Sequence, residues 1–203
     1  MKMLKDEIRE QILMVAREEF YQKGFQNTSM RVIAQKTGVS VSNIYNYFAS
    51  KEEIFHEIAD KASRSLDTLV KNLLTFREGK DFDDERFLEK FTEIVPASVF
   101  SLLQQYRIEI KIIIEGSERT KYAGVKNALI DALATYFNEN MKKNLGTRGG
   151  VSIEHSFLMR VLAMNLVNGL IEIAKQYQSD AWAEENIKSL MRYHIRGMVQ
   201  FFD

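Results

Sequence analysis

The sequence predicts an all-α protein, with a small N-terminal three-helix domain followed by a larger helical domain. Apolar residues recur at helical spacing along almost the whole chain. The composition agrees, since 45% of the residues are hydrophobic and a single proline accompanies ten glycines. At 203 residues, the chain is long enough for one large or two small domains. We expect the domains to span residues 1–50 and 51–203.

Composition excludes some classes of function. The chain has no cysteine, which rules out disulfides and thiolate metal sites. The charged N-terminus lacks the apolar segment of a signal peptide, and no stretch of about 20 apolar residues is free of charges. We therefore expect a cytoplasmic protein without a membrane span. Because 28 basic residues balance 28 acidic residues, any affinity for nucleic acid must come from a local arrangement of charge.

The first predicted helix runs from about Leu4 to Lys23. Its inward face consists of Ile8, Ile12, Val15, Ala16 and Phe20. Lys2, Lys5 and Arg9 at its start could lie near a phosphate backbone. They are mixed with acidic residues, however, and solvated surface charge is the commoner role of such side chains.

The stretch from Thr28 to Glu53 has the pattern of two short helices joined by a tight turn and followed by a third helix. Ser29 is suited to cap the first helix. Gly38 is suited to end it, because glycine takes the left-handed conformation without steric cost. Ser40 is expected to cap the second helix. This pattern predicts a helix-turn-helix, whose second helix can enter the major groove of DNA.

Two further patterns complete the motif. Ile44 and Phe48 are spaced to point inward from the second helix. Ser50-Lys51-Glu52-Glu53 has the pattern of a capping box that opens a third helix. The apolar periodicity of this third helix continues to about Phe76, so we expect one long helix that links the motif to the second domain.

Residues 8–55 resemble the DNA-binding domain of the TetR family of transcriptional repressors. The matching positions are Gly24-Phe25, Thr28-Ser29, Ile33-Ala34, Thr37-Gly38-Val39-Ser40, Ile44-Tyr45, Tyr47-Phe48, Ser50-Lys51-Glu52 and Phe55. So many positions at fixed spacing form a specific signal. The family often has a Lys-Gly or similar small pair after the turn, where this chain has Val41-Ser42. The operator sequence therefore cannot be inferred from a relative.

The residues expected to contact DNA lie on and around the second helix of the motif. They are Thr28, Ser29, Ser40, Val41, Ser42, Asn43, Tyr45, Asn46, Tyr47 and Lys51. Asparagine can pair with adenine, serine can bond a base edge and valine can touch a thymine methyl. Tyr45 and Tyr47 carry hydroxyls that can reach phosphates, or else they pack under the turn. The resemblance implies that Thr28 and Lys51 clamp phosphates on either side of the groove.

From Asp83 onward, the pattern is helical throughout. We expect helices at about 84–103, 105–115, 119–145, 153–177 and 181–202. Pro96 should kink or split the first of these, since proline removes a backbone donor. The clearest predicted loops are Arg77–Asp81 and Gly146–Gly150.

The last two helices carry more apolar surface than one chain of this size is expected to cover. Between Phe157 and Ala174 the apolar residues go nearly all round the helix. The residues expected at an interface with a second copy are Leu162, Leu166, Leu170, Ile187, Met191, Ile195, Met198 and Phe202. The resemblance implies a homodimer through the same pair of helices, which would present two recognition helices to palindromic half-sites. The alternative is that both helices are internal to a monomer.

The resemblance also implies a small-molecule cavity among the remaining helices. The candidate lining residues are Phe91, Val95, Phe100, Arg107, Ile114, Tyr122, Tyr136, Met159, Asn165 and Asn168. Plain core packing is the alternative for each apolar candidate. A buried Asn165 or Asn168 amide would need a partner, which could be a ligand, a water or the second copy. Arg107 could bind an acidic ligand or pair with Glu109 or Glu115.

We expect no catalytic residue, metal or cofactor. Glu53-Ile54-Phe55-His56 has the Glu-x-x-His spacing of di-iron bundles, but the second copy that such a site needs is missing. No Gly-rich phosphate loop, serine elbow or zinc signature occurs.

The sequence therefore predicts a homodimeric transcriptional regulator that acts as a repressor and is released from a palindromic operator by a small-molecule effector. Under this hypothesis, the effector favours a conformation in which the long helix from Lys51 tilts. One alternative is a DNA-binding protein of the same fold that responds to a protein partner or to nothing. Another is a dimeric interaction module that does not bind DNA.

Overall fold

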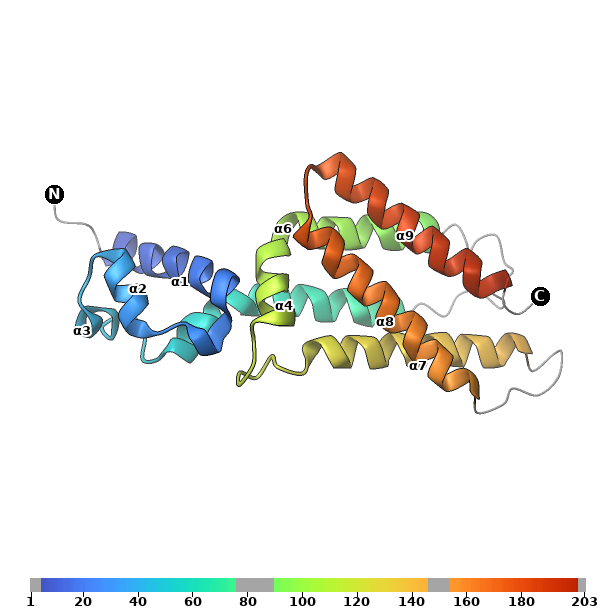
Figure 1. Cartoon of the computed structure of the whole chain (residues 1–203), viewed down its shortest axis with the longest axis horizontal. Helices are drawn as coiled ribbons and strands as arrows, with labels where there is room; N and C mark the ends of the chain where they lie inside the picture. The colour runs from blue at the N-terminus through green and yellow to red at the C-terminus, as the bar shows by residue number, and fades with distance from the viewer. Residues whose placement is uncertain (1–4, 76–89, 146–153, 201–203) are drawn as a thin grey trace. The chain divides into compact units, whose positions relative to one another are not determined.

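The computed structural model describes residues 5–75, 90–145 and 154–200, and these ranges contain helices and turns without a strand. The elements are α1 (Lys5–Asn27), α2 (Met30–Thr37), α3 (Val41–Ile44), α4 (Lys51–Thr75), the π-helical turn η1 (Lys90–Ile94), α6 (Val95–Glu115), α7 (Val125–Leu145), α8 (Glu154–Lys175) and α9 (Asp180–Gln200). The predicted all-α fold, with an N-terminal helix-turn-helix and a helical C-terminal part, is confirmed (Figure 1).

By their contacts, the residues form two compact units. The first unit comprises residues 1–64 and 108–125, and the second comprises residues 65–107 and 126–203. Helices α4 and α6 each continue from one unit into the other. The domain boundary expected after residue 50 stays a prediction.

In the first unit, α2 and α3 form the predicted helix-turn-helix beside α1 (Figure 1). The hydroxyl of Ser29 accepts the Val32 N–H at 3.3 Å, and α2 ends at Gly38, whose φ is 71°. The hydroxyl of Ser40 accepts the Asn43 N–H at 3.1 Å and thereby caps α3. The helix caps expected at Ser29, Gly38 and Ser40 are therefore all confirmed.

The capping box at the start of α4 is confirmed with one change. The hydroxyl of Ser50 accepts the Glu53 N–H at 3.2 Å, as the motif requires. The Glu53 carboxylate, however, accepts the N–H of Ala49, one residue before the expected position. The helix then runs without interruption to Thr75. The loops predicted at Arg77–Asp81 and Gly146–Gly150 lie outside the described residues.

Helix α1 is interrupted directly after its predicted end at Lys23, where Gly24 leaves the helical conformation at φ 73°, and a short helical segment then continues to Asn27. A close backbone approach explains the glycine. A Cβ atom on Gly24 would lie 3.3 Å from the Cα of Gly116, and the Phe25 N–H donates to the Gly116 carbonyl at 2.7 Å. The end of α1 is thereby fastened to the end of α6.

The core of the first unit contains an aromatic cluster. The ring centroids of Phe20, Phe25 and Phe55 lie 5.0 to 6.0 Å apart. Around them the predicted inward residues Ile12, Ala16, Ile33, Ile44 and Phe48 are buried. Apolar periodicity therefore identified the inner faces of α1, α2 and α3.

Three predicted helix boundaries in the C-terminal part can be compared with the structure. The break expected near residue 104 is confirmed as a kink two residues later, because α6, from Val95 to Glu115, is interrupted by the non-helical residue Tyr106 (φ −131°) (Figure 1). The helix type changes from π to α at Val95, next to Pro96, without a break in the helix, so the kink or split expected at this proline stays a prediction. The start expected at residue 119 is wrong, because residues 118–124 form turns and α7 begins at Val125.

A local hydrogen-bond network explains the late start of α7. The Thr120 hydroxyl donates to the Ser117 carbonyl at 2.7 Å and accepts the Tyr122 N–H at 3.1 Å. Arg119 takes a left-handed conformation at φ 64°. Side-chain bonds of this kind compete with the helical pattern.

In the second unit, α8 packs on α9, and α9 also contacts η1 (Figure 1). The buried apolar residues of this unit include Phe91, Leu103, Leu133, Phe137, Met159, Ala163, Leu166, Val167, Ala183, Ile187, Met191 and Ile195. Gly169 permits the close contact of the two helices, because a Cβ atom there would lie 2.7 Å from a methyl of Leu190.

Most of α8 is unusually apolar. Among the described residues, the segment Ser156–Lys175 is long and apolar enough to cross a membrane by length and composition. The core helix of a globular protein passes the same test, and this segment carries the charged residues Arg160 and Glu172. Its composition alone is weak evidence for a membrane span.

Candidate nucleic-acid interface and effector groove

Helix α3 directs polar side chains outward because its apolar anchors are buried. Ile44 is 0% exposed and Phe48 is 1% exposed. The side chains left exposed or half-buried on this turn are those of Val41, Ser42, Asn43, Tyr45, Asn46 and Tyr47. Tyr45, at 53%, extends furthest into solvent among the large apolar side chains of the motif. This surface can reach base edges and phosphates.

The polar groups on this surface are partly paired with one another. One amide hydrogen of Asn46 is donated to the Asn43 side-chain oxygen at 3.2 Å. The hydroxyls of Ser40 and Ser42 lie 3.1 Å apart. The Asn46 amide keeps its oxygen and its second hydrogen, which is the pair that a bidentate contact to adenine requires.

Lys51 and Thr28, both expected to bind phosphate, make contacts within the first unit. The Lys51 ammonium donates to the carbonyls of Phe25 at 2.6 Å and Thr28 at 2.7 Å, and it lies 4.0 Å from the centroid of the Phe25 ring. Burial lowers the pKa of this ammonium. The Thr28 side chain is buried, and its hydroxyl donates to the Gly24 carbonyl at 2.9 Å. An ammonium has three hydrogens, so one remains for a phosphate.

A buried carboxylate joins α1 to α2. Glu19 is 1% exposed, and its two oxygens accept hydrogen bonds from Lys23 at 2.9 Å and from Lys36. The bond from Lys36 is the main cause that lowers the pKa of Glu19. Lys23 and Lys36 therefore stabilise the packing of α1 against α2.

Arg31 is a candidate that the sequence analysis missed. It is exposed in the first turn of α2, two residues after the Ser29 cap. Within the described part of the chain, no ion pair involves Arg31, whereas Arg9 pairs with Glu57. Its position in the first turn of a helix, where backbone N–H groups can bind an anion, could have identified it from the sequence.

His56 lies in a hydrogen-bond cluster. Its Nδ1 is 2.9 Å from the Tyr122 hydroxyl, and its Nε2 is 2.7 Å from the Lys121 ammonium. Because an ammonium only donates, Nε2 is the accepting nitrogen. Burial raises the pKa of Tyr122 to about 12. Within the described ranges, no group of three or more His, Asp or Glu residues is placed to hold a metal ion.

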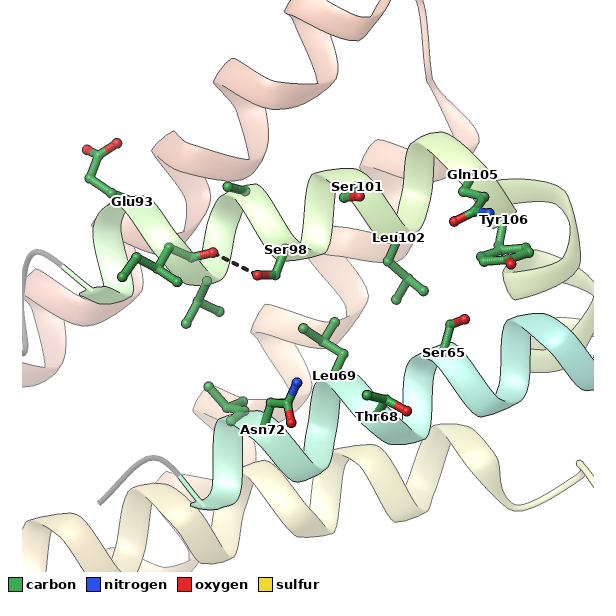
Figure 2. Close-up of a pocket in the computed structure, with 14 residues that line it drawn as sticks. Ser65, Thr68, Leu69, Asn72, Glu93, Ser98, Ser101, Leu102, Gln105 and Tyr106 are labelled. Carbon is green, nitrogen blue, oxygen red and sulfur yellow. Dashed lines mark hydrogen bonds between the residues drawn. The ribbon is translucent and has the colours of Figure 1, made fainter. Parts of the chain in front are cut away.

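A groove of about 830 Å³ lies within the second unit, between α4 and the segment formed by η1 and α6 (Figure 2). Its apolar lining residues are Leu69, Leu73, Ile94, Val95, Ala97 and Leu102. Its polar lining residues are Ser65, Thr68, Asn72, Glu93, Ser98, Ser101, Gln105 and Tyr106. Apolar area with a few polar groups is the usual make-up of a small-molecule site. Glu93 is the one charged side chain among the described lining residues.

Of the residues expected to line a ligand cavity, the described groove contains Val95. Ile114 and Tyr122 belong to the first unit and the other candidates to the second. Phe91, Tyr136 and Met159 are buried at 4% exposure or less, and Phe100 is half-buried. A different pattern in the sequence could have indicated the groove. Serine, threonine and asparagine recur at helical spacing at positions 65, 68 and 72, as do polar residues at 98, 101 and 105.

Three polar candidates lie away from the groove. Asn165 and Asn168 are exposed on α8 in the single chain, so their role as ligand contacts stays a prediction. The Arg107 guanidinium lies 4.5 Å from the centroid of the Tyr177 ring. Glu109, one of the partners weighed for Arg107, instead pairs with Arg17 at 2.5 Å.

The residues expected at a dimer interface are mostly covered by the chain itself. Leu166, Ile187, Met191, Ile195 and Met198 are exposed by 4% or less, and Leu162 and Leu170 are half-buried. Phe202 lies outside the described residues. This seam therefore has little surface for a second copy. The exposed large apolar side chains on the same two helices are Phe157 at 74%, Met164 at 40% and Tyr193 at 75%.

Comparison with known proteins concerns the N-terminal region first. Residues 12–58 match the family described as bacterial regulatory proteins, tetR family. The uncharacterized HTH-type transcriptional regulator YfiR of Bacillus subtilis is 32% identical over 85 residues, which are 40% of this chain and 42% of that protein. The HTH-type transcriptional regulator UidR of Escherichia coli K12 is 26% identical over 117 residues, 58% of this chain and 56% of that protein. The chain spans about half the length of these curated relatives.

Solved structures extend the similarity to the whole fold. A transcriptional regulator from Aquifex aeolicus VF5 has a TM-score of 0.53 at 19% identity, covering 90% of this chain and 96% of that chain. The fatty acid degradation regulator FadR from Bacillus halodurans has a TM-score of 0.55 at 18% identity, covering 97% and 98%. At these identities, the likeness concerns the fold alone. Both curated relatives are described as transcriptional regulators, which agrees with the expectation that this chain is not an enzyme.

Proposed function

We propose that this chain, which belongs to the tetR family of bacterial regulatory proteins, binds a specific duplex DNA sequence and regulates transcription. The observation that carries the proposal is the outward polar face of α3. Ser42, Tyr45 and Asn46 are exposed there, while Ile44 and Phe48 are buried. A helix held in this way can enter the major groove and present its side chains to base edges.

Base readout is assigned to the two asparagines, Ser42 and Val41. The free oxygen and hydrogen of the Asn46 amide suit the N6 and N7 atoms of adenine. Asn43 holds the Asn46 amide at 3.2 Å and retains its own amide hydrogens for a neighbouring base. Ser42 can donate or accept at a base edge, and Val41 can touch a thymine methyl.

Phosphate contacts are assigned to Ser29, Ser40, Arg31, Lys51 and the two tyrosines, Tyr45 and Tyr47. Ser29 and Ser40 accept backbone N–H groups. The Ser29 hydroxyl hydrogen remains for an anion, and the Ser40 hydroxyl shares a hydrogen bond with that of Ser42. Lys51 keeps one ammonium hydrogen, and Arg31 adds a positive charge at the start of α2. Thr28 takes a different role in this proposal, because its carbonyl helps to hold the Lys51 ammonium at 2.7 Å.

We further propose that the protein is a homodimeric, cytoplasmic repressor and that a small molecule in the groove of Figure 2 releases it from a palindromic operator. The groove residues Ser65 to Leu73 and the phosphate ligand Lys51 lie on one continuous helix, α4. An occupant that favours one position of α4 therefore also favours one position of Lys51. The effector can shift this equilibrium only by its difference in affinity for the two states.

A selection of random duplex DNA against the purified protein, at fixed salt, tests the DNA-binding proposal. We expect one palindromic sequence to be enriched. Asn46→Ala should relax specificity at one position of each half-site and remove about 1–3 kcal/mol of discrimination there. Arg31→Ala should weaken all sequences alike and reduce the salt slope by about one. Asn127→Ala, which removes an exposed amide on α7, is the matched control and should change neither property.

The outcomes separate the proposal from its alternatives. Binding that neither Asn46→Ala nor Arg31→Ala alters would overturn the role of α3. If no sequence is enriched, the dimeric interaction module without DNA binding is favoured instead. Repeating the selection with fractions of a small-molecule extract tests the effector. A palindrome that no fraction releases would favour control by a protein partner or no control.

A further inference from the structure

The polar residues that line the groove of Figure 2 form two matching rows. One row stands on α4 at positions 65, 68 and 72, and the other stands on α6 at positions 98, 101 and 105. Both rows repeat the same spacing, which keeps each row on one side of its helix. Seven residues of helix rise about 10 Å, so each row follows the groove for roughly that length. In Figure 2, Ser65 and Gln105 lie toward one end of the groove, and Asn72 and Ser98 lie toward the other.

An apolar floor accompanies the two polar rows. Leu102 is buried, and Leu69, Leu73 and Val95 are half-buried. By contrast, the polar residues at positions 68, 72, 98, 101 and 105 are all exposed. The floor is therefore deeper than the rows, and each helix contributes one row. A molecule that fits this groove places an apolar face on the floor and its two edges along the polar rows.

The groove offers no positive charge to a ligand. Among the lining residues that the structure describes, there is no lysine, arginine or histidine, and Glu93 is the one acidic residue. Figure 2 shows the Glu93 side chain directed away from α4. Together with a hydrogen bond from Glu184, the charge of Glu93 raises the pKa of Lys188 on α9. A carboxylate or phosphate in the groove would lose water without gaining a cationic partner, which costs free energy.

We propose that the groove binds an uncharged, elongated molecule with an apolar face and with hydroxyl or carbonyl groups along both edges. The hydroxyls and amides of the polar rows both donate and accept hydrogen bonds, so they can pair with either kind of group. The Ser98 hydroxyl donates to the Ile94 carbonyl at 3.0 Å and therefore offers its oxygen to a hydroxyl of the ligand. This inference rests on the small-molecule effector of the proposed function and adds the chemical class of that effector.

A series of stilbenes tests the class, with binding to the full chain measured by calorimetry at pH 7. Resveratrol is uncharged, flat and elongated, and it has hydroxyls on both of its rings. The second probe, trans-stilbene, is the same body without hydroxyls. In the third probe, a carboxylate replaces the lone hydroxyl of one resveratrol ring. Resveratrol should bind about threefold more tightly than trans-stilbene, which cannot pair with the polar rows, and about tenfold more tightly than the carboxylate probe.

Substitutions in the α6 row locate the binding. Ser101→Ala should weaken resveratrol binding about threefold, through the loss of one hydrogen bond, and should leave trans-stilbene binding unchanged. Ser101→Lys supplies the missing cation and should strengthen binding of the carboxylate probe about fivefold. Thr135→Ala and Thr135→Lys make the matching changes at an exposed position of α7 and should leave all the affinities unchanged. Helical circular dichroism checks that each variant is folded.

The class of the ligand and the effector of the proposed function fail in different ways. A carboxylate probe that binds wild type as tightly as resveratrol would overturn the class and keep the groove as a site. Absence of resveratrol binding, or resveratrol binding that Ser101→Ala leaves unchanged, would also overturn the class. An extract fraction that releases the operator and whose active component is an acid would keep the effector and overturn its class. Resveratrol binding in the groove, with no extract fraction releasing the operator, would keep the class and overturn the effector.

Discussion

The two compact units hold their helices by different means. In the first unit, directional polar contacts fix the elements, as when the Lys51 ammonium holds two carbonyls and the Glu19 carboxylate holds two lysines. In the second unit, α8 and α9 are joined by an apolar seam, and α4 is separated from the start of α6 by a groove of about 830 Å³. The first arrangement specifies one geometry for α3, the helix proposed to contact DNA. The second leaves space that a ligand can fill.

The largest expected difference between the units comes from deleting one apolar side chain in each. Phe20→Ala should lower the free energy of unfolding of the first unit by about 3–5 kcal/mol, because Phe20 is 1% exposed and packs on Phe55 at 5.0 Å. Leu69→Ala at the half-buried groove wall should cost only about 1 kcal/mol. Urea unfolding followed by circular dichroism measures both. Equal losses would show that the groove wall is packed as tightly as the aromatic cluster.

Lys51→Met tests whether Lys51 is a structural clamp as well as a phosphate ligand. The variant removes two hydrogen bonds to main-chain carbonyls and should lower the free energy of unfolding by about 2 kcal/mol. It should also weaken DNA binding. Arg31→Met removes an exposed charge and should weaken DNA binding while stability stays within about 0.5 kcal/mol. Unchanged stability in Lys51→Met would contradict the clamp.

Glu19→Gln tests the buried carboxylate and should lower the free energy of unfolding at pH 7 by about 1–2 kcal/mol. The hydrogen bond from Lys36 holds the folded pKa of Glu19 below its ordinary value of 4.5. The stabilisation that the Glu19 carboxylate contributes is therefore complete above the ordinary pKa of 4.5. It is lost as the pH falls through the lower pKa that Glu19 has in the folded protein. The difference between wild type and variant should shrink in acid, measured by urea unfolding from pH 7 to pH 3. Glu18→Gln, at the exposed neighbouring position, should show no such convergence.

The sequence was most informative where the deciding interactions are local. The caps at Ser29, Gly38 and Ser40 depend on residues within three or four positions, and all three were predicted correctly. The clamp made by Lys51 joins residues 23 and 26 positions apart, and no local pattern indicates it. Such contacts follow only from the way in which α1 and α4 pack.

The C-terminal helices show the limit of periodicity. The seam through Ile187 and Ile195 was correctly identified as apolar, but α8 and the rest of the chain cover it, at 0% and 1% exposure. Periodicity identifies a face that must be covered and does not tell which surface covers it.

The smallest expected change in stability comes from filling the groove. Ala97 is exposed and lines the groove, so Ala97→Trp should occupy its space while the free energy of unfolding changes by no more than about 0.5 kcal/mol. A neutral apolar dye, Nile red, is the probe, since Glu93 is the one charge among the described lining residues. Its fluorescence should rise on binding to wild type, and Ala97→Trp should weaken that binding about tenfold, which corresponds to roughly 1.4 kcal/mol.

Ala128→Trp, at an exposed position of α7, is the control and should bind the dye as wild type does. If Ala97→Trp binds the dye unchanged, the groove is not the apolar site. Dye binding could instead weaken while the operator affinity of the dye-free protein stays the same. Occupancy of the groove in the second unit and DNA binding by the first unit would then be separable properties. An effector could couple these two properties through α4.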